Sequence, residues 1–246
     1  MPWSVFAVVF LCVSVSLWWI LILNILSIET STEYCSVALW QDGVVRERCE
    51  WVGQKHSEVL LGMVDGVLQD AGCGIRDTDG IAFGKGPGSF TGVRIACGVA
   101  QGLAFGANLN VVGVCTLLAL AEAAGKGKVI AAIDARMGEL YFAVYEKREG
   151  VWMTLVEPCL CKADTAPVVI GFDWFGCGSG FALNADLRTR YAAQLCGVDA
   201  QAIPQAAAVA RLGALEFARG NSVDAALALP LYLRDKVALT TRERMK

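Results

Sequence analysis

Histidine is almost absent from this 246-residue sequence, and its scarcity excludes several kinds of active site. The one histidine is His56, so a Ser or Cys nucleophile would have only this imidazole as its base, and no histidine pair exists to ligate a catalytic metal. No two Asp or Glu residues have a spacing that indicates acid–base catalysis. With Ser57 and Glu58, His56 more plausibly belongs to the N-terminal capping region of the helix that follows. We therefore expect no catalytic residue and no metal ligand.

Positive charge is also in short supply. The chain has 21 Lys and Arg against 24 Asp and Glu, a net charge of −3, which leaves no basic surface for strong nucleic-acid binding by this chain alone. Hydrophobic residues make up 55% of the sequence, so a substantial core can form, in one large domain or two small ones. The ten cysteines are scattered, and the Cys159–Cys161 spacing is too short for a zinc knuckle. We expect buried thiols in a reducing cytoplasm.

Charged residues are missing altogether from Pro2 to Ile28. The apolar run Val5–Leu23 approaches the roughly 20 residues that cross a bilayer as a helix, so a membrane anchor is one interpretation. However, no Lys or Arg precedes the run, and it continues without a linker into a predicted central strand. We favour the other interpretation, an apolar leader over residues 1–23 outside the native domain, with translation starting near Leu23 or Asn24. Stable membrane association is not expected.

Hydrophobic periodicity predicts a similar order of elements twice along the chain. In the first half we expect strands at Asn24–Ile28, Cys35–Trp40, Val44–Trp51, Asp79–Phe83 and Val111–Val114, and helices at Lys55–Ala71, Val93–Ala107 and Leu117–Ala124. In the second half we expect strands at Val129–Ile133, Glu139–Tyr145, Val151–Val156, Val168–Ile170 and Trp174–Cys177, a helix at Ala206–Ala218 and an extended finish at Leu231–Leu233. This order predicts an α/β protein of two ribonuclease-H-like domains, 24–124 and 125–246. A return of the C-terminal segment to the first domain is left open.

Glycine is concentrated between the predicted fourth strand and the helix after it. The loop Gly84–Gly92 either presents backbone amides to an anion or a partner, or is simply a tight strand-to-helix turn. It lacks the Gly-Lys-Ser/Thr of a Walker A loop. Further on, Gly98, Gly102 and Gly106 share one face of their helix, which indicates close approach by another backbone. That backbone is either the domain's own sheet, which is slightly favoured, or a helix of a partner subunit.

Five segments, in order, resemble the signatures of the TsaB (YeaZ) family. They cover Ile25–Thr32, His56–Leu61, Gly84–Arg94, Ile133–Tyr141 and Pro230–Val237. The resemblance implies a two-domain actin/Hsp70/sugar-kinase fold and a non-catalytic, cytoplasmic scaffold that heterodimerises with TsaD. TsaD is the enzyme that places threonylcarbamoyl on adenosine 37 of tRNAs reading codons that start with A. A TsaE-type ATPase and tRNA would join through the complex, the complex would use ATP, and this chain alone would need no cofactor. A homodimer is also compatible with the family.

The resemblance further implies that the helices Lys55–Ala71 and Val93–Ala107 build the dimer surface. Candidate interface residues are His56, Val59, Leu60, Met63, Arg94, Gly98, Gly102 and Gly106. TsaD-type proteins carry a His-x-x-x-His metal pair, and the corresponding positions here fall near Thr116 and Leu120, which cannot replace it.

The alternative function is a small-molecule kinase or ATPase of the same fold. Kinases of this fold hold phosphates on glycine-containing loops, whereas Glu29–Thr32 contains no glycine and Asp134–Gly138 lacks a glycine pair. A structural ion pair at a strand end is the favoured explanation for Asp134 and Arg136. Gly176-x-Gly178-x-Gly180 resembles an adenosine-side loop only weakly. Candidate nucleotide or phosphate contacts are Thr30, Ser31, Gly86, Gly88, Ser89, Asp134 and Arg136.

Overall fold

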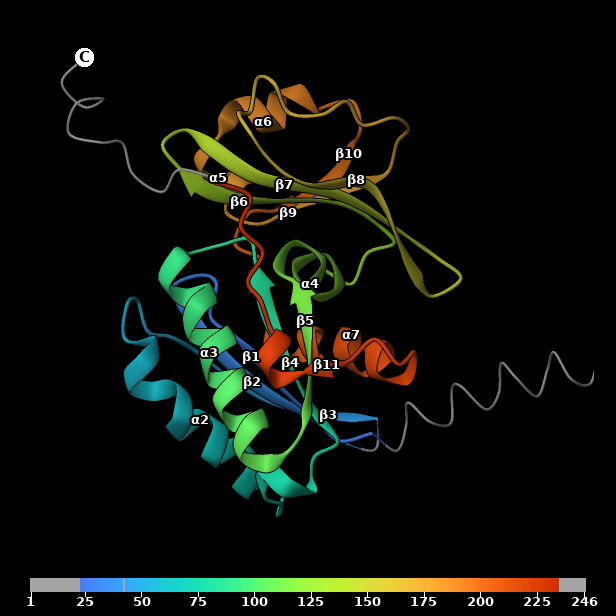
Figure 1. Cartoon of the computed structure of the whole chain (residues 1–246). Coiled ribbons are helices and arrows are strands. Elements are labelled where there is room, and N and C mark those ends of the chain that lie inside the picture. The colour runs from blue at the N-terminus through green and yellow to red at the C-terminus, as the bar shows by residue number, and fades with distance from the viewer. Residues whose placement is uncertain (1–22, 42, 235–246) are drawn as a thin grey trace, which may run out of the picture.

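The structure, a computed structural model, describes residues 23–41 and 43–234. The predicted apolar leader, apart from Leu23, lies outside the described residues, as does the end of the Pro230–Val237 segment. Within the described residues two sheets stand one above the other, each in its own lobe (Figure 1).

The first sheet contains the meander expected from the sequence. Its order is β11-β5-β4-β1-β2-β3, with β1 parallel to β4 and antiparallel to β2. Because β1 is central and covered on both faces, it is a continuous buried run rather than an alternating one. The strands are β1 (Ile25–Glu29), β2 (Tyr34–Gln41), β3 (Val44–Trp51), β4 (Gly80–Gly86), β5 (Asn110–Cys115) and β11 (Val223–Asp224).

The second sheet repeats this topology. Its order is β10-β9-β6-β7-β8. Each of these strands has the same position as its counterpart in the order β5-β4-β1-β2-β3 of the first sheet. The duplication predicted from element order is therefore confirmed, and the two ribonuclease-H-like lobes form the actin/Hsp70/sugar-kinase architecture. The strands are β6 (Lys128–Arg136), β7 (Glu139–Arg148), β8 (Val151–Cys161), β9 (Trp174–Cys177) and β10 (Leu195–Asp199).

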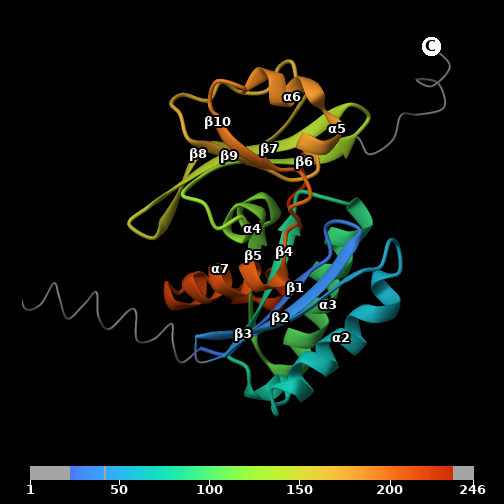
Figure 2. The same ribbon diagram turned by 180° about the vertical axis from the view of Figure 1, so that it is seen from behind.

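Helices cover both faces of the first sheet. On one face α2 (His56–Asp70) and α3 (Phe90–Ala107) lie side by side, and on the other lies α7 (Ala206–Ala218), as both views show (Figures 1 and 2). Between the lobes, α4 (Thr116–Ala123) contacts α7 and β6. The second lobe carries α5 (Gly180–Leu183) and α6 (Ala185–Arg190), and short 3-10 turns occur at Ile75–Asp77 and Ala225–Leu227.

The chain returns to the first lobe after completing the second. The Ser27 hydroxyl in β1 donates a hydrogen bond to the Ala206 carbonyl (2.8 Å), and the Ala206 amide donates to the Ser36 hydroxyl (2.9 Å). These bonds fix the start of α7 on the first sheet. After β11, a segment that we call the strap (residues 225–234) runs along α3 and up to the second lobe. The Leu231 amide donates to the Lys85 carbonyl (2.6 Å) on the way.

Three expectations need correction. Val168–Ile170 forms no strand; only Val169 packs into the core of the second lobe, and Val168 and Ile170 are exposed. α3 starts at Phe90 rather than Val93, since the Ser89 side chain caps it by accepting a bond from the Gly92 amide. The nine cysteines of the described residues are free thiols, but only Cys35, Cys97 and Cys177 are buried; four others are partly buried, and Cys49 and Cys196 are exposed.

Candidate functional site

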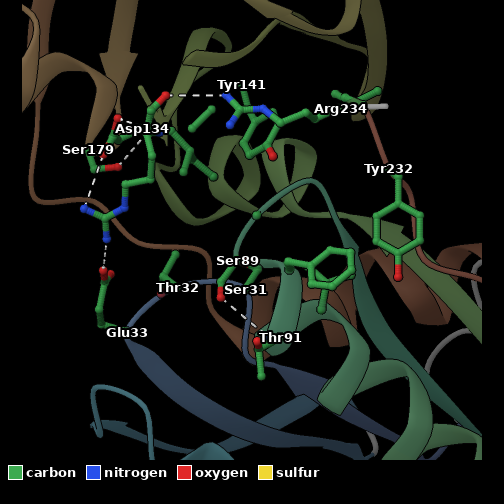
Figure 3. A pocket seen from close by; sticks show the side chains of 18 of the residues that line it. Ser31, Thr32, Glu33, Ser89, Thr91, Asp134, Tyr141, Ser179, Tyr232 and Arg234 are labelled. Carbon is green, nitrogen blue, oxygen red and sulfur yellow. Dashed lines mark hydrogen bonds and ion pairs between the residues drawn. The ribbon is translucent and has the colours of Figure 1, made fainter. Parts of the chain in front are cut away.

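A cavity of about 830 Å³ lies between the two lobes. The turn after β1 and the start of α3 line it from the first lobe, the end of β6 lines it from the second, and the last residues of the strap close one side. Figure 3 shows these walls facing one another, with Ser31 and Ser89 opposite Asp134 and Tyr141, and Tyr232 on the strap beside them.

The floor of this cleft is a close contact between the turn after β1 and the start of α3. The Thr30 hydroxyl donates to the Gly92 carbonyl (2.7 Å), and the Ser89 amide donates to the Ser31 carbonyl (2.8 Å). A Cβ on Gly92 would lie 1.9 Å from the Thr30 carbonyl oxygen, and one on Gly88 would lie 2.6 Å from the Ser31 Cβ. Only glycine fits at these two positions, which explains part of the glycine-rich loop.

The rest of that loop is strand. Gly84 and Gly86 belong to β4, so the strand-to-helix connection is short, as expected of a tight turn. Gly86 has a φ of 98°, and a Cβ added there would lie 2.9 Å from the Leu231 carbonyl oxygen. Glycine is therefore required at this position for the strap to lie against β4. Gly86 does not line the cleft, and Thr30 is fully buried with its hydroxyl already bonded. Thr30 and Gly86, two of the predicted phosphate contacts, therefore do not lie at this cleft.

Glu29 does not face the cleft either. Its side chain is buried behind the turn, where one carboxyl oxygen accepts from the Ser31 amide (2.6 Å) and the other from the Thr116 hydroxyl (3.4 Å). Burial raises the pKa of the Glu29 carboxyl, and the hydrogen bonds from Ser31 and Thr116 oppose that rise. Glu29 is thus a packing and hydrogen-bonding residue of the first lobe.

The wall from the second lobe is built at the end of β6. The Asp134 amide donates to the Ser179 hydroxyl (3.0 Å), which fixes the strand end beside α5. Arg136 pairs with Asp134 (3.6 Å) and, across the cleft, with Glu33 (2.8 Å). The structural ion pair expected between Asp134 and Arg136 is present, but the side chains of Arg136 and Glu33 are mostly exposed, so the bridge adds little stability.

Five predicted phosphate contacts do meet in this cleft. Ser31, Gly88 and Ser89 come from the first lobe, and Asp134 and Arg136 come from the second. Arg94, a predicted interface residue, lies at the edge of the cleft in a cluster with Phe90 and Tyr232, which sequence reasoning did not single out as site residues. There the Arg94 guanidinium lies 3.7 Å from the Phe90 ring centre and donates to the Tyr232 hydroxyl (2.7 Å).

The positions that correspond to the histidine pair of TsaD-type proteins, near Thr116 and Leu120, lie in α4. Across residues 23–41 and 43–234, no group of three or more His, Cys, Asp and Glu side chains could hold a metal ion. Thr116 and Leu120 are both fully buried. The glycines from 176 to 180 serve packing, because a Cβ on Gly178 would lie 2.4 Å from the Ala132 carbonyl oxygen and one on Gly176 would lie 2.8 Å from the Phe181 ring.

Several predicted interface residues are turned inward. Leu60 and Met63 are 1% and 5% exposed and belong to the core between α2 and the first sheet. His56 is also buried, and its Nε2 lies 2.9 Å from the Thr32 carbonyl and 3.2 Å from that of Tyr34. Carbonyl oxygens only accept, so Nε2 donates and ties α2 to the turn. These three residues cannot form a partner surface. Val59 is half-buried.

The glycine stripe on α3 is turned outward. Gly98, Gly102 and Gly106 are exposed, and a Cβ on any of them would meet nothing within 4 Å in the part of the chain that the structure describes. The interpretation that these glycines admit the domain's own sheet is therefore wrong. Beside them Phe105 is 83% exposed, and on the adjoining strap Leu227 and Leu229 are 65% and 72% exposed.

The same helix has the composition of a membrane span. Within the described ranges, α3 is the one helix whose length and hydropathy would allow it to cross a bilayer. Its buried side, which includes Val93, Ala96 and Ala100, packs on the first sheet, so packing accounts for that side's apolar character.

Known proteins match this chain over most of its length. Residues 40–240 match the family model of TsaD, described as tRNA N6-adenosine threonylcarbamoyltransferase. The tRNA threonylcarbamoyladenosine biosynthesis protein TsaB of Escherichia coli (strain K12) is 39% identical over 224 residues, 88% of this chain and 96% of that protein. The protein of the same description from Haemophilus influenzae is 37% identical over 228 residues, 87% of this chain and 95% of that one.

Solved structures agree with the sequence relatives. YeaZ from Pseudomonas aeruginosa aligns with a TM-score of 0.78 at 38% identity, covering 86% of this chain and 100% of that one. A second structure from the same organism, an uncharacterized protein with similarity to peptidase YeaZ, aligns with a TM-score of 0.81 at 39% identity and the same coverage.

Proposed function

Because this chain belongs to the TsaB (YeaZ) family and so serves tRNA threonylcarbamoyladenosine biosynthesis, we propose that it acts there as a non-catalytic scaffold. In this proposal it works in the cytoplasm and heterodimerises with a TsaD-type catalytic subunit. Through that complex it meets a TsaE-type ATPase and tRNA. The complex consumes ATP, while this chain needs no cofactor of its own.

The exposed glycine stripe is the observation that carries the proposal. Glycine in a helix costs roughly 1 kcal/mol relative to alanine, and here no neighbour within the described chain makes use of the missing side chains. Gly98, Gly102 and Gly106 would let a partner helix approach the α3 backbone closely. Phe105, next to Gly106, and Leu227 and Leu229, on the strap that contacts α3, are exposed and supply apolar area. We take this surface, which we call the α3 face, as the contact for the catalytic subunit.

The kinase or ATPase alternative is less well supported. A kinase of this architecture would need an acidic side chain after β1 that reaches its cleft, and Glu29 is instead buried and bonded to Ser31 and Thr116. The lining of the cleft between the lobes includes no lysine. A homodimer through the α3 face remains an alternative to the heterodimer, because the same glycines would serve either partner.

The test is co-purification of the chain with the TsaD-type subunit of the same organism, followed by reconstituted threonylcarbamoylation of tRNA. Modification should be lost when this chain is omitted, and the chain alone should hydrolyse no ATP. Unchanged modification without it would refute the scaffold role.

A leucine substitution in the glycine stripe tests whether the TsaD-type subunit binds the α3 face. Gly102→Leu should abolish co-purification while the circular dichroism spectrum stays native, because its Cβ enters open space. The matched control is Gly127→Leu, at another exposed glycine with nothing within 4 Å, which should leave pairing intact. If both variants co-purify equally well with the TsaD-type subunit, the stripe on α3 does not form the interface. Analytical ultracentrifugation of each variant without TsaD would show whether the homodimer uses the same face.

A further inference from the structure

We propose that the Arg94 guanidinium is the charged contact of the α3 face and binds a carboxylate of the TsaD-type subunit, an inference that rests on the scaffold function proposed above. Residues four apart are neighbours along one row of a helix surface. One such row of α3 contains Arg94, Gly98, Gly102 and Gly106, and all four are exposed. The row of close-packing glycines therefore ends in a positive charge on the side of the cleft.

The structure holds the Arg94 side chain in place and leaves most of its donors unused. The guanidinium carbon lies 3.7 Å from the centre of the Phe90 ring and 5.6 Å from that of Tyr232, and Nε donates to the Tyr232 hydroxyl (2.7 Å). These contacts remove part of the rotamer entropy that an unrestrained arginine loses on binding. The two terminal nitrogens bond to no acceptor among residues 23–41 and 43–234. They are part of the donor fork that matches a carboxylate.

No carboxylate of the described chain compensates this charge. The two arginines that line the cleft are paired, Arg136 with Glu33 and Arg234 with Glu139. Arg94 forms no such pair within residues 23–41 and 43–234. A guanidinium that is already fixed, lacks a counter-charge and stands at the end of a close-packing row indicates a partner that supplies the carboxylate.

A protein carboxylate suits this surface better than the phosphates of a nucleic acid. Binding along a phosphate backbone requires several cations, whereas Arg94 is the one charged residue in the sequence of α3 and the whole chain has a net charge of −3. The other exposed side chains of the α3 face, Phe105, Leu227 and Leu229, are apolar. One charge beside glycines and apolar side chains is the composition of a protein interface.

The row also specifies the partner helix and its direction. Since α3 contains no Asp or Glu, a second copy of this chain that packs α3 against α3 offers Arg94 no carboxylate from that helix. From Arg94 to Phe105 the helix rises roughly 16 Å, at about 1.5 Å per residue. We expect the TsaD-type helix to carry an Asp or Glu opposite Arg94 and, at that distance, small or apolar residues that accept Phe105. Because the two ends of the α3 face differ, the partner helix fits in one direction only.

The test is the affinity of the full chain for the TsaD-type subunit, measured by biolayer interferometry at low and high salt. Arg94→Gln should weaken binding roughly tenfold or more and reduce its salt dependence, because the partner carboxylate is left unpaired. Arg94→Lys, which keeps the charge but not the fork, should bind with intermediate affinity. Tyr232→Phe removes the acceptor of Nε, so it should weaken binding in the parent but not in Arg94→Gln. Arg211→Gln, at an exposed residue of α7 on the opposite face of the first sheet, should bind like the parent.

Carbodiimide coupling can identify the partner residue. The reagent joins an amine to a neighbouring carboxylate through an amide bond and takes up the water that is lost. In the complex of Arg94→Lys, mass spectrometry should find a cross-link from position 94 to one Asp or Glu of the TsaD-type subunit, and the parent complex should lack it. Arg94→Glu should abolish pairing, and replacing the identified acid by lysine should restore it.

The outcomes separate this inference from the scaffold proposal. If Arg94→Gln binds like the parent while Gly102→Leu does not bind, the charged contact is refuted and the scaffold proposal stands. A cross-link from position 94 only to carboxylates of this same chain would also refute the contact. If the parent chain does not bind the TsaD-type subunit at all, both proposals are refuted. Circular dichroism spectra that match the parent's would exclude misfolding of the variants as the cause.

Discussion

Gly92 is the residue at which the turn after β1 and the start of α3 approach most closely. We expect Gly92→Ala to destabilise the chain by about 1–3 kcal/mol, the usual range for overpacking, because its Cβ would lie 1.9 Å from a backbone oxygen that cannot swing aside. Urea unfolding would measure this difference. Gly62→Ala is the control, since its Cβ meets nothing within 4 Å of the described chain. Equal stability of the Gly92 variant and the parent would contradict the geometry of the floor.

Glu29 should give the fold a measurable pH dependence. Burial raises the pKa of its carboxyl in the folded chain above the ordinary value of 4.5. The unfolded chain therefore loses this proton first, so the stability that the protonated group contributes is complete below pH 4.5 and is lost as pH rises through the folded pKa. Glu29→Gln keeps an oxygen that can accept from the Ser31 amide but removes the titration.

We accordingly expect the free energy of unfolding of Glu29→Gln, relative to the parent, to increase as pH rises from 4.5 toward neutrality. The slope is at most about 1.4 kcal/mol per pH unit for one proton. Urea denaturation of both proteins from pH 4.5 to 7.5 would show it. A difference that stays constant with pH would mean that Glu29 titrates normally.

At the scale of elements, substitutions in the glycine stripe of α3 should change the stability of the chain and its binding to a partner in opposite directions. Gly98→Ala and Gly106→Ala should each stabilise the isolated chain by up to about 1 kcal/mol, because alanine is the better helix former and its methyl group meets open space. The same substitutions should weaken co-purification with the TsaD-type subunit, since a methyl group separates the two backbones. Thermal unfolding and a pull-down on the same samples measure both effects. Loss of stability in either variant would show that α3 has an intramolecular neighbour at that site.

Which elements the sequence could reveal depended on how fully each is buried. α7, with eight buried residues among thirteen, and β9, with three among four, were predicted at their observed bounds, because largely buried elements are continuous apolar runs in the sequence. β10 was missed because none of its five residues is buried, so Leu195–Asp199 shows no alternation. For α2 the pattern located the helix, but interface residues chosen by resemblance included Leu60 and Met63, which point at the sheet.

The site was less predictable than the elements. Ser31, Gly88 and Ser89 stood out because the motifs around them are distinctive, and they do meet in the cleft. That Thr30 and Gly86 face elsewhere depends on a hydroxyl bonded to Gly92 and on the passage of the strap at Leu231. Both contacts join segments far apart in the chain, and local sequence carries no signal for such pairs.

At the scale of the whole molecule, the lobes are joined at opposite ends. On one side Trp152, in the β7–β8 hairpin of the second lobe, donates from its indole to Glu122 of α4 (2.6 Å) and packs against the buried cluster that includes residues of α7. On the other side the strap runs past the cleft to Arg234, whose guanidinium pairs with Glu139 and donates to the Arg136 carbonyl. The strap also contacts α3 through Gln101, so the α3 face and the cleft share one connecting segment.

If the strap holds the lobes together, breaking its upper contact should loosen the cleft without unfolding either lobe. We expect a double-mutant cycle of Arg234→Gln and Glu139→Gln to give a coupling energy of about 1 kcal/mol, because the Arg234 side chain is only 16% exposed and the pair is partly shielded from water. Hydrogen exchange should rise in the strap and at the Phe90 and Thr91 amides, but not in β1. Arg219→Gln, which removes an exposed pair with Glu216 at the end of α7, is the control and should change neither region. If the effects of the two substitutions on the free energy of unfolding are additive and hydrogen exchange is unchanged, the strap does not hold the lobes together. Trp152 and α4 would then be the contacts that join them.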